Sequence, residues 1–468
     1  MAVGLSAQNG GPLFSFDSTN GTSPLALVQG IDGNLYGTAL TGGADYSGTL
    51  FSLTTAGVEA TLYNFCTAGL NCLLLSGDPL VQAPNGDFYG TAWQGGAYGM
   101  GAIYKATPSG EVTTLYSFCA QKGCPDGQFP YSPLVRAVDG NFYGTTFYGG
   151  ASPYCNGECG TIFKMTPGGQ LTTVYSFCAQ PGCTDGALPN SLIQASDGNF
   201  YGTADLGGVA NCLGFLLCGT VFKFTAAGEL TTLHAFCATD CRDGGQPNGL
   251  IESNEGGYFY GTASSGGVEK RGSVFRITPS GEFNTIYSFR CPNDCTDGRY
   301  PNSGLIQGTD GNLYGTTSSG GGSSASGGSI FGVTPRGELT TLYTFCTAYC
   351  YISGPVAGLV QATNGAFYGT IQGGGANGDG AVFTFSLGHS NFAKPQPAFA
   401  KVGKQVQILG TNLTGATSVT FNGTPAAFTV TSDTLIDTTV PPGATSGTIQ
   451  VVTPGGTLAS NVRFRVLP

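Results

Sequence analysis

The spacing of the cysteines in this 468-residue chain indicates that they form disulfides or bind a metal. Each of the sixteen has a neighbour, with three to five residues between them: Cys66 with Cys72, Cys119 with Cys124, Cys155 with Cys159, Cys178 with Cys183, Cys212 with Cys218, Cys237 with Cys241, Cys291 with Cys295, and Cys346 with Cys350. Structural zinc usually needs CxxC knuckles brought together in fours, so zinc is the weaker alternative and the spacing favours eight local disulfides. This density of disulfides predicts an oxidising compartment, and therefore an extracellular or cell-surface protein.

Histidine is the commonest proton shuttle and metal ligand, and the chain has two. His234 lies in TTLHAF, where the sister segments carry an aromatic residue, so we interpret it as a substituted aromatic position. His389 lies in a short connector and is expected to be exposed. A copper-radical oxidase propeller would need two histidines and a Tyr–Cys pair at one place, and these two positions do not supply that set of residues. We predict no catalytic residue, no metal ligand and no cofactor.

Four carboxylates recur in an Asp-Gly pair that follows the second cysteine of a pair: Asp126, Asp185, Asp243 and Asp297. Calcium binding and glycoside hydrolysis are the functional alternatives for such residues. The four come from consecutive repeat units at equivalent positions, so we expect them to be held apart. Asp before Gly is also a common turn former, and turn formation is the favoured interpretation.

Sugar binding by aromatic stacking has limited support in the sequence. Trp93 is the only tryptophan, with Tyr148 and Tyr154 as further candidates on the same variable loops. Three Asn-x-Thr sequons are candidate glycosylation sites: Asn20, Asn412 and Asn422.

One heptapeptide recurs along most of the chain. DGNFYGT or a close variant begins at residues 32, 85, 139, 197, 256, 310 and 364. Each unit contains four strand-like runs, as at 191–195, 199–204, 219–224 and 231–236, which is typical of one propeller blade. We interpret the motif as a structural joint, in which Asp-Gly makes a hairpin turn and the aromatic residues pack between units.

The two ends of the repeat region predict how it closes. The seventh unit stops after its third strand, GAVFTF at 380–385, and the missing strand matches PLFSF at 12–16. Pairing these segments would close the ring and remove exposed sheet edges. The prediction is an all-β fold: an N-terminal tail at 1–11, a closed seven-bladed β-propeller at 12–386 and an Ig-like β-sandwich at 387–468.

Strand direction sorts the connections onto two sides. The Asp-Gly turns lie on one side, where we also expect the C-terminal sandwich, and all cysteines fall in or beside the longer loops of the other side. Because binding surfaces on rigid scaffolds usually lie on variable loops, this second side is the predicted functional surface.

Composition excludes two classes of partner. A net charge of −10 with scattered Lys and Arg argues against nucleic acid, and no apolar run is long enough for a membrane span. Residues 1–11 lack the basic start and apolar stretch of a signal peptide, so we expect no signal sequence in this chain.

The repeat DGNFYGT…GG…GTIFKMTPGGQLTTVYSF resembles the GloVer tandem repeat of bacterial surface and exported proteins, over roughly residues 12–386. The segment VGKQVQILGTNLTGATSVTFNG, followed by TVPPGATSGTIQVVTPGG, is similar to an IPT/TIG domain over 392–468. That resemblance implies an Ig-fold module that acts as a spacer or contact module. Neither resemblance implies catalytic residues.

The predicted function is a non-enzymatic extracellular scaffold. Two mechanisms remain open: binding of a glycan or surface protein through the cysteine-bearing side, as in an adhesin, or head-to-tail self-assembly into a filament or surface layer. The rival class is a polysaccharide-active enzyme, which would need convergent acids near the axis of the ring.

Overall fold

The computed structural model describes residues 10–66, 73–75, 77–155, 157–209, 218–291, 295–321, 327–345, 354–355 and 357–468. Its regular elements are strands, apart from a single short 3-10 turn at Pro181–Cys183 in the described chain. None of these described elements is a helix with the length and apolar character needed to cross a bilayer. The protein is therefore all-β, as the composition predicted.

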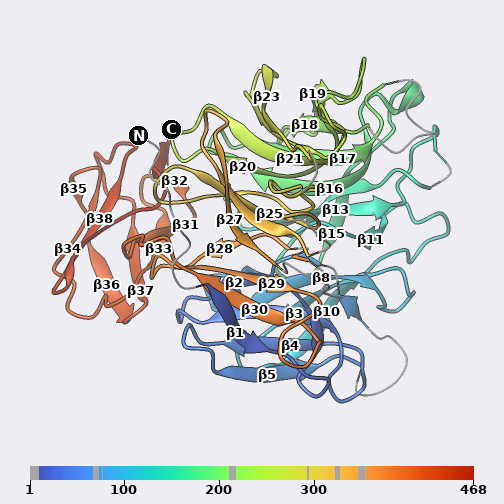
Figure 1. Ribbon diagram of the computed structural model, residues 1–468. Coiled ribbons are helices and arrows are strands. Elements are labelled where there is room, and N and C mark those ends of the chain that lie inside the picture. Colours follow the sequence, from blue (N-terminus) through green and yellow to red (C-terminus); the bar gives the residue numbers. More distant parts are fainter. Residues whose placement is uncertain are drawn as a thin grey trace.

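Residues 11–385 form seven small antiparallel sheets that follow one another along the chain (Figure 1). Sheet 1 contains β2 (Thr22–Gln29), β3 (Leu35–Thr41), β4 (Thr49–Leu53) and β5 (Glu59–Asn64). Sheet 2 contains β6 (Leu74–Leu75), β7 (Val81–Gln82), β8 (Phe88–Gln94), β9 (Ala102–Ala106) and β10 (Val112–Ser117). Sheet 3 contains β11 (Gln128–Pro130), β12 (Val135–Arg136), β13 (Phe142–Tyr148), β14 (Thr161–Met165) and β15 (Leu171–Ser176).

Sheets 4 to 7 repeat the same order of strands. They contain β16 (Ala187–Gln194), β17 (Phe200–Leu206), β18 (Thr220–Phe224) and β19 (Leu230–Ala235); β20 (Gly245–Glu252), β21 (Phe259–Ser265), β22 (Ser273–Ile277) and β23 (Phe283–Ser288); β24 (Ile306–Gln307), β25 (Leu313–Thr317), β26 (Ser329–Val333) and β27 (Leu339–Thr344); and β28 (Val360–Gln361), β29 (Phe367–Ile371), β30 (Ala381–Phe385) and β1 (Gly11–Ser15).

The outer strand of sheet 7 comes from the other end of the repeat region. β1 pairs antiparallel with β30, from Gly11 opposite Thr384 to Ser15 opposite Ala381. The backbone N–H of Phe16 continues the ladder to Gly380 O at 3.0 Å. The predicted pairing of the N-terminal segment with the last unit is therefore confirmed.

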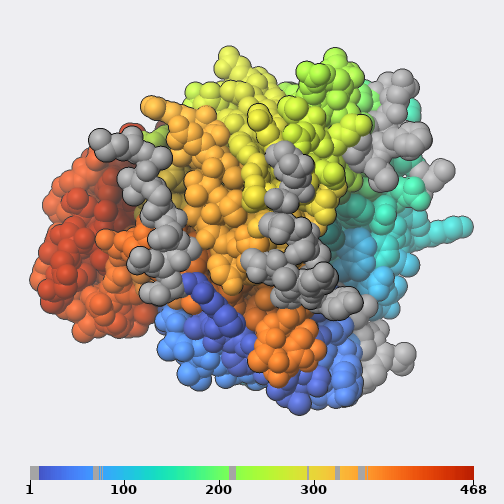
Figure 2. All heavy atoms as spheres, viewed as in Figure 1, coloured from blue at the N-terminus to red at the C-terminus, as the bar shows by residue number. Residues whose placement is uncertain are grey.

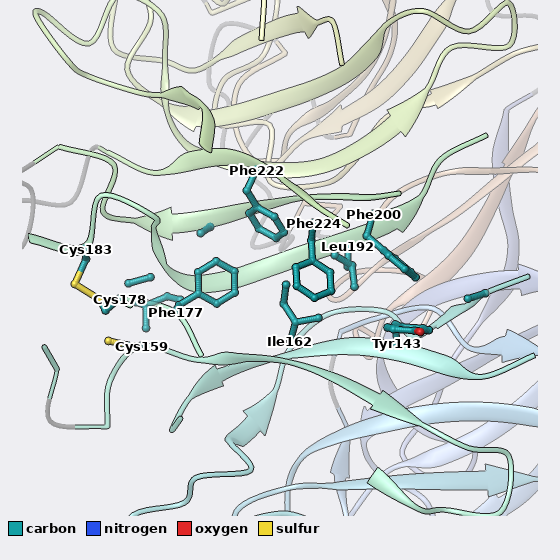
Figure 3. Packing of buried hydrophobic residues seen from close by; sticks show 14 residues of the cluster. Tyr143, Cys159, Ile162, Phe177, Cys178, Cys183, Leu192, Phe200, Phe222 and Phe224 are labelled. Carbon is teal, nitrogen blue, oxygen red and sulfur yellow. A yellow bond between two sulfur atoms is a disulfide. The ribbon is translucent and has the colours of Figure 1, made fainter. Parts of the chain in front are cut away.

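At five junctions, the contacts between consecutive sheets include a second strand of one sheet and a first strand of the next. β3 contacts β6, β8 contacts β11, β13 contacts β16, and β17 contacts β20, while β29 of sheet 7 contacts β2 of sheet 1. Buried aromatic and aliphatic side chains fill the spaces between sheets. Figure 3 shows one such core, where Ile162 and Phe177 of one sheet face Phe222 of the next.

The repeated heptapeptide forms a joint at each hairpin turn. In the fourth copy, the carboxylate of Asp197 accepts the backbone N–H of Asn199 at 2.9 Å and the hydroxyl of Tyr201 at 2.8 Å. The Tyr201 ring packs on Phe259, which corresponds to Phe200 in the next copy, with centroids 4.1 Å apart. Turn formation and packing between units therefore use the same seven residues.

A second contact between sheets uses the residue that ends the first strand. The side-chain oxygen of this residue accepts a hydrogen bond from a backbone N–H of the preceding unit at six junctions. The pairs, with the N–H donor first and the side-chain acceptor second, are Ile31 and Gln82, Val138 and Gln194, Ser196 and Glu252, Asn254 and Gln307, Thr309 and Gln361, and Thr363 and Gln29. At the seventh junction the donor position is Pro84 and the acceptor position is Arg136. Proline has no N–H and arginine has no acceptor, so both halves of this bond are missing together.

Residues 394–467 form a separate lobe at one side of the molecule (Figure 2). Its sheets consist of β31 (Lys394–Gln396), β33 (Gln405–Leu409), β37 (Leu435–Thr439) and β36 (Phe428–Ser432); β35 (Thr424–Pro425), β34 (Ser418–Phe421), β38 (Ile449–Thr453) and β39 (Gly456–Ala459); and the parallel pair β32 (Phe399–Lys401) and β40 (Arg465–Leu467). One buried cluster that includes Val406, Phe421, Ile436 and Ile449 lies between the two larger sheets.

This C-terminal lobe lies on the hairpin turns between the first and second strands. Thr434 donates to Ile31 O at 2.7 Å, and Arg465 donates to Glu255 O at 2.8 Å. Gln407 donates to Pro84 O at 3.2 Å. The lobe therefore contacts sheets 1, 2 and 5 on the side opposite the cysteine-bearing loops, in agreement with the expected direction of exit from β30.

Candidate functional site

The cysteine-bearing loops contain local disulfides with the predicted pairing. The bonds are Cys119–Cys124, Cys155–Cys159, Cys178–Cys183, Cys237–Cys241 and Cys291–Cys295. Cys66 and Cys218 are also disulfide-bonded.

The other three predicted pairs involve residues outside the described part of the chain. Cys72 is the predicted partner of Cys66, and Cys212 is the predicted partner of Cys218. Both lie outside the described residues. Cys346 and Cys350, which form the eighth predicted pair, lie outside the described residues as well. These three pairings stay predictions.

The recurrent Asp-Gly carboxylates anchor these loops to the outer strand. Asp126 accepts the hydroxyl of Tyr116 at 2.8 Å and the backbone N–H of Cys119 at 2.9 Å. Asp185 repeats the arrangement with Tyr175 at 2.8 Å, and Asp297 also accepts the hydroxyl of its strand-four tyrosine. Each carboxylate thus has a structural partner of its own, and the described chain does not gather the four into a calcium or catalytic cluster.

His234 occupies the tyrosine position of this arrangement. Its Nε2 lies 2.9 Å from Asp243 Oδ2, and its ring stacks on Phe283 with centroids 3.7 Å apart. The prediction of a substituted aromatic position is therefore confirmed. The pair borders an open hollow of about 530 Å³ between the outer parts of sheets 4 and 5.

The expectation that His389 is exposed is wrong. Its side chain is 11% exposed, accepts a hydrogen bond from Gln361 Nε2 at 2.8 Å and lies 3.6 Å from Asp310 Oδ2. Burial raises the pKa of Asp310, but hydrogen bonds from His389, Tyr314 and Asn312 outweigh it and lower the pKa below the ordinary value. The connector packs onto the sixth heptapeptide, a tertiary contact that has no local signal in the sequence.

A cluster of five aromatic side chains lies on the cysteine-bearing side of sheets 2 and 3. We name it the aromatic platform: Trp93, Phe129, Tyr131, Phe147 and Tyr148. The Trp93 ring lies 4.9 Å from Phe129, 5.2 Å from Tyr131 and 5.9 Å from Phe147. Phe147 also contacts Tyr148 at 4.9 Å.

The platform is open to solvent. Tyr131 is 45% exposed, and the other four rings are half-buried. An exposed group of aromatic rings is unusual on a soluble protein, because apolar surface is normally removed from water. Such a group marks a candidate ligand site.

Two carboxyl groups lie beside the platform. Burial raises the pKa of Tyr131, and nearby Asp78 and Asp205 raise it further. Burial also raises the pKa of Asp205 to about 7, although the hydrogen bond from Asn190 Nδ2, at 2.5 Å, acts in the opposite direction. Asp205 therefore changes its charge near neutral pH, and can donate a hydrogen bond below that pH.

The platform consists of departures from the repeat. Trp93 and Phe147 stand two residues after the threonine of the heptapeptide, where sheets 5 and 6 carry Ser264 and Ser318. Tyr131 follows Pro130 in the same way that Asn190 follows Pro189. The sequence predicted Trp93 and Tyr148 as candidates for sugar stacking, and comparison of the units would have found the other three positions.

The other surface candidates do not join this site. Tyr154 is 51% exposed and makes no ring contact with another described residue. Asn412 and Asn422 are exposed, with left-handed φ angles of 57° and 47°, and Asn20 is half-buried. Glycosylation of these three sequons stays a prediction.

Repeat units of antiparallel strands with a shared heptapeptide define a tandem-repeat protein. A model of the Gloeobacter/Verrucomicrobia repeat family matches residues 5–216, 75–254 and 214–436. The chain belongs to this family, in agreement with the GloVer resemblance. No curated protein matches the chain.

Several solved structures show a distant likeness to this chain. An extracellular domain assigned to a hybrid two-component system of B. thetaiotaomicron has 9% identity and a TM-score of 0.49, covering 86% of this chain and 46% of that one. A gluconolactonase from Xanthomonas campestris has 13% identity and a TM-score of 0.36, covering 61% and 78%. At these values neither likeness supports a conclusion about activity.

Proposed function

We propose that the protein is a non-enzymatic extracellular scaffold that binds a glycan through the aromatic platform. In this proposal the seven sheets are the blades of a closed β-propeller, and the C-terminal lobe is an Ig-like sandwich of the IPT/TIG type. The contact between β29 and β2 and the pairing of β1 with β30 support closure. The disulfides fit an extracellular location, because such bonds persist in oxidising compartments.

The observation that carries the proposal is the aromatic platform itself. Pyranose rings present apolar C–H faces that pack on aromatic side chains, while their hydroxyl groups need hydrogen-bond partners nearby. Trp93, Tyr131 and Phe147 supply the first requirement, and the carboxyl group of Asp205, which Asn190 holds in place, supplies the second. Because the C-terminal lobe covers the opposite side, the platform is left available to a ligand.

Two exposed tyrosines provide a matched test. Tyr131 (45% exposed) belongs to the platform and Tyr154 (51% exposed) does not, so Tyr131→Ala and Tyr154→Ala remove the same side chain at similar exposure. Calorimetric titration with cello-, xylo-, manno- and chito-hexaose is expected to find at least one ligand. Tyr131→Ala should weaken it about tenfold, roughly 1.4 kcal/mol, and Tyr154→Ala should leave it unchanged. If the wild-type protein binds none of these hexaoses, or if Tyr131→Ala and Tyr154→Ala bind equally tightly, the proposal is contradicted.

A polysaccharide-active enzyme is the second candidate. The favouring observation is that Asp205, with its pKa raised to about 7, lies with Asp78 around Tyr131, and glycosidases use a protonated acid beside a second carboxylate. Chromatography of each hexaose after incubation distinguishes the two functions. Products that disappear in Asp205→Asn support the enzyme, and intact hexaoses support the scaffold.

A further inference from the structure

A second group of side chains departs from the repeat at the junction of sheets 5 and 6. The guanidinium carbons of Arg271 and Arg299 lie 5.8 and 5.5 Å from the centre of the Tyr300 ring. Arg271 also donates a hydrogen bond to the Tyr300 hydroxyl at 2.5 Å. All three side chains are half-buried, so each keeps part of its surface in solvent.

The backbone fixes this group on the same side of the molecule as the aromatic platform. The N–H of Tyr300 donates to Arg271 O at 2.9 Å, as the N–H of Phe129 donates to Met100 O at 2.8 Å. Tyr300 and Phe129 both precede a proline and have φ angles of 58° and 55°. The two groups therefore occupy equivalent positions in different units, one between sheets 5 and 6 and the other between sheets 2 and 3.

Within the described residues, neither arginine has the anionic partner that such groups normally have. No ion pair joins either of them to a carboxylate of the described chain. The Nε of Arg299 is buried and makes no hydrogen bond within that part of the structure. Two like charges against one ring repel each other, and an unpaired donor costs free energy, so this arrangement favours a bound anion.

The repeat shows that the arginines are not needed for the joint. The position of Arg271 holds Met100 in unit 2 and Cys218 in unit 4, and the position of Arg299 holds Gln128 in sheet 3 and Gly245 in sheet 5. The same backbone hydrogen bond forms at those junctions without any cation. The positive charge is therefore an addition to the scaffold, in a chain whose net charge is −10.

We propose that Arg271 and Arg299 form a binding site for an oxyanion, with Tyr300 holding both guanidinium groups in place. Guanidinium offers paired N–H donors that match the oxygens of a carboxylate, sulfate or phosphate. The ligand class is thus a small oxyanion, free or carried on a larger molecule such as a sulfated or uronate-containing sugar. The site is separate from the aromatic platform, and its existence does not depend on the glycan proposal.

The test is titration of the full chain with sodium sulfate, sodium phosphate and glucuronate at constant ionic strength set by chloride. Wild type is expected to show saturable binding of at least one of these by calorimetry, with a rise in Tm at the same concentrations. Arg271→Gln and Arg299→Gln should each weaken binding at least fivefold. Glucuronate as the tightest ligand indicates a uronate sugar, and sulfate or phosphate indicates an esterified or free ion.

Arg276→Gln is the matched control. Arg276 also lies over a tyrosine, 5.2 Å from the centre of the Tyr258 ring, but belongs to no such pair, so this variant should bind as wild type does. Absence of saturable binding in the wild-type protein overturns the proposal. This part of the test does not depend on whether any variant folds. Equal losses in all three variants also overturn it, as does unchanged affinity in folded Arg271→Gln and Arg299→Gln.

Discussion

The backbone N–H of Thr363 donates a 3.0 Å hydrogen bond to the side-chain oxygen of Gln29, although the two residues are 334 positions apart. Gln29 Nε2 lies 3.2 Å from Thr363 Oγ1, so the two groups are joined twice. The same N–H to side-chain bond links five other pairs of consecutive units. The junction between the last and first units is therefore built like five of the six others, which supports the proposed closed ring.

Removal of this junction bond should destabilise the whole repeat region. Gln29→Ala leaves the N–H of the buried Thr363 without its partner, and we expect a loss of about 1–3 kcal/mol in the free energy of unfolding. Arg136→Ala is the control, because Arg136 holds the equivalent position, is exposed and accepts no such bond; its cost should stay below about 0.5 kcal/mol. Urea unfolding measures both, and equal costs would contradict this account.

The exceptional junction gives a second prediction. Arg136→Gln alone should gain nothing, because Pro84 has no N–H to donate. Combined with Pro84→Ser, the new glutamine can form the bond seen at the six other junctions. A double-mutant cycle in urea should give a favourable coupling energy of about 0.5–1.5 kcal/mol. A coupling energy of zero would mean that these bonds do not stabilise the junctions.

His234→Tyr should be tolerated. The equivalent pairs Tyr116–Asp126 and Tyr175–Asp185 have oxygen–oxygen distances of 2.8 Å, so tyrosine at 234 can bind Asp243 in the same way. We expect a change in unfolding free energy within about 1 kcal/mol, whereas His234→Ala should lose about 1–3 kcal/mol because it removes the partner of Asp243 Oδ2. A larger loss of stability in His234→Tyr would show that the imidazole has a role of its own.

Asp205 predicts a specific dependence of stability on pH. Its pKa rises from 3.8 to about 7 in the folded protein, so between these values the folded state binds more protons than the unfolded state. The raised pKa of Asp205 therefore stabilises the folded state below pH 4, and this contribution is lost as pH rises to 7. The contribution to the free energy of unfolding is about 4 kcal/mol at most. Urea midpoints at pH 4.5, 5.5, 6.5 and 7.5 should fall less in Asp205→Asn than in wild type. Parallel falls would contradict the raised pKa.

Local features of the fold could be predicted from the sequence because the units can be compared with one another. The Asp-Gly turn, the local disulfides and the pairing of β1 with β30 each follow from residues within one unit or from a strand that one unit lacks. The aromatic platform could not be predicted in the same way. Its rings come from the first and second strands of two sheets, and only the angle between those sheets brings Trp93 close to Tyr131.

The contact of His389 with Asp310 escaped prediction for a related reason. It depends on the path of the connector after β30, and that path is set by packing against sheets 6 and 7. Similarly, Arg271 and Arg299 are 28 positions apart and meet only through the ring of Tyr300. Contacts between units are tertiary, so a search for motifs within a unit does not find them.

Trp93 is the only tryptophan of the chain and lies in the aromatic platform, so its fluorescence reports directly on the proposed glycan site. Titration with the hexaoses should give a saturable change in tryptophan emission, with the same dissociation constant as calorimetry. Tyr131→Ala should shift that titration to about tenfold higher concentration. A hexaose that binds by calorimetry but leaves the emission of Trp93 unchanged would contradict the assignment of the platform as the binding site.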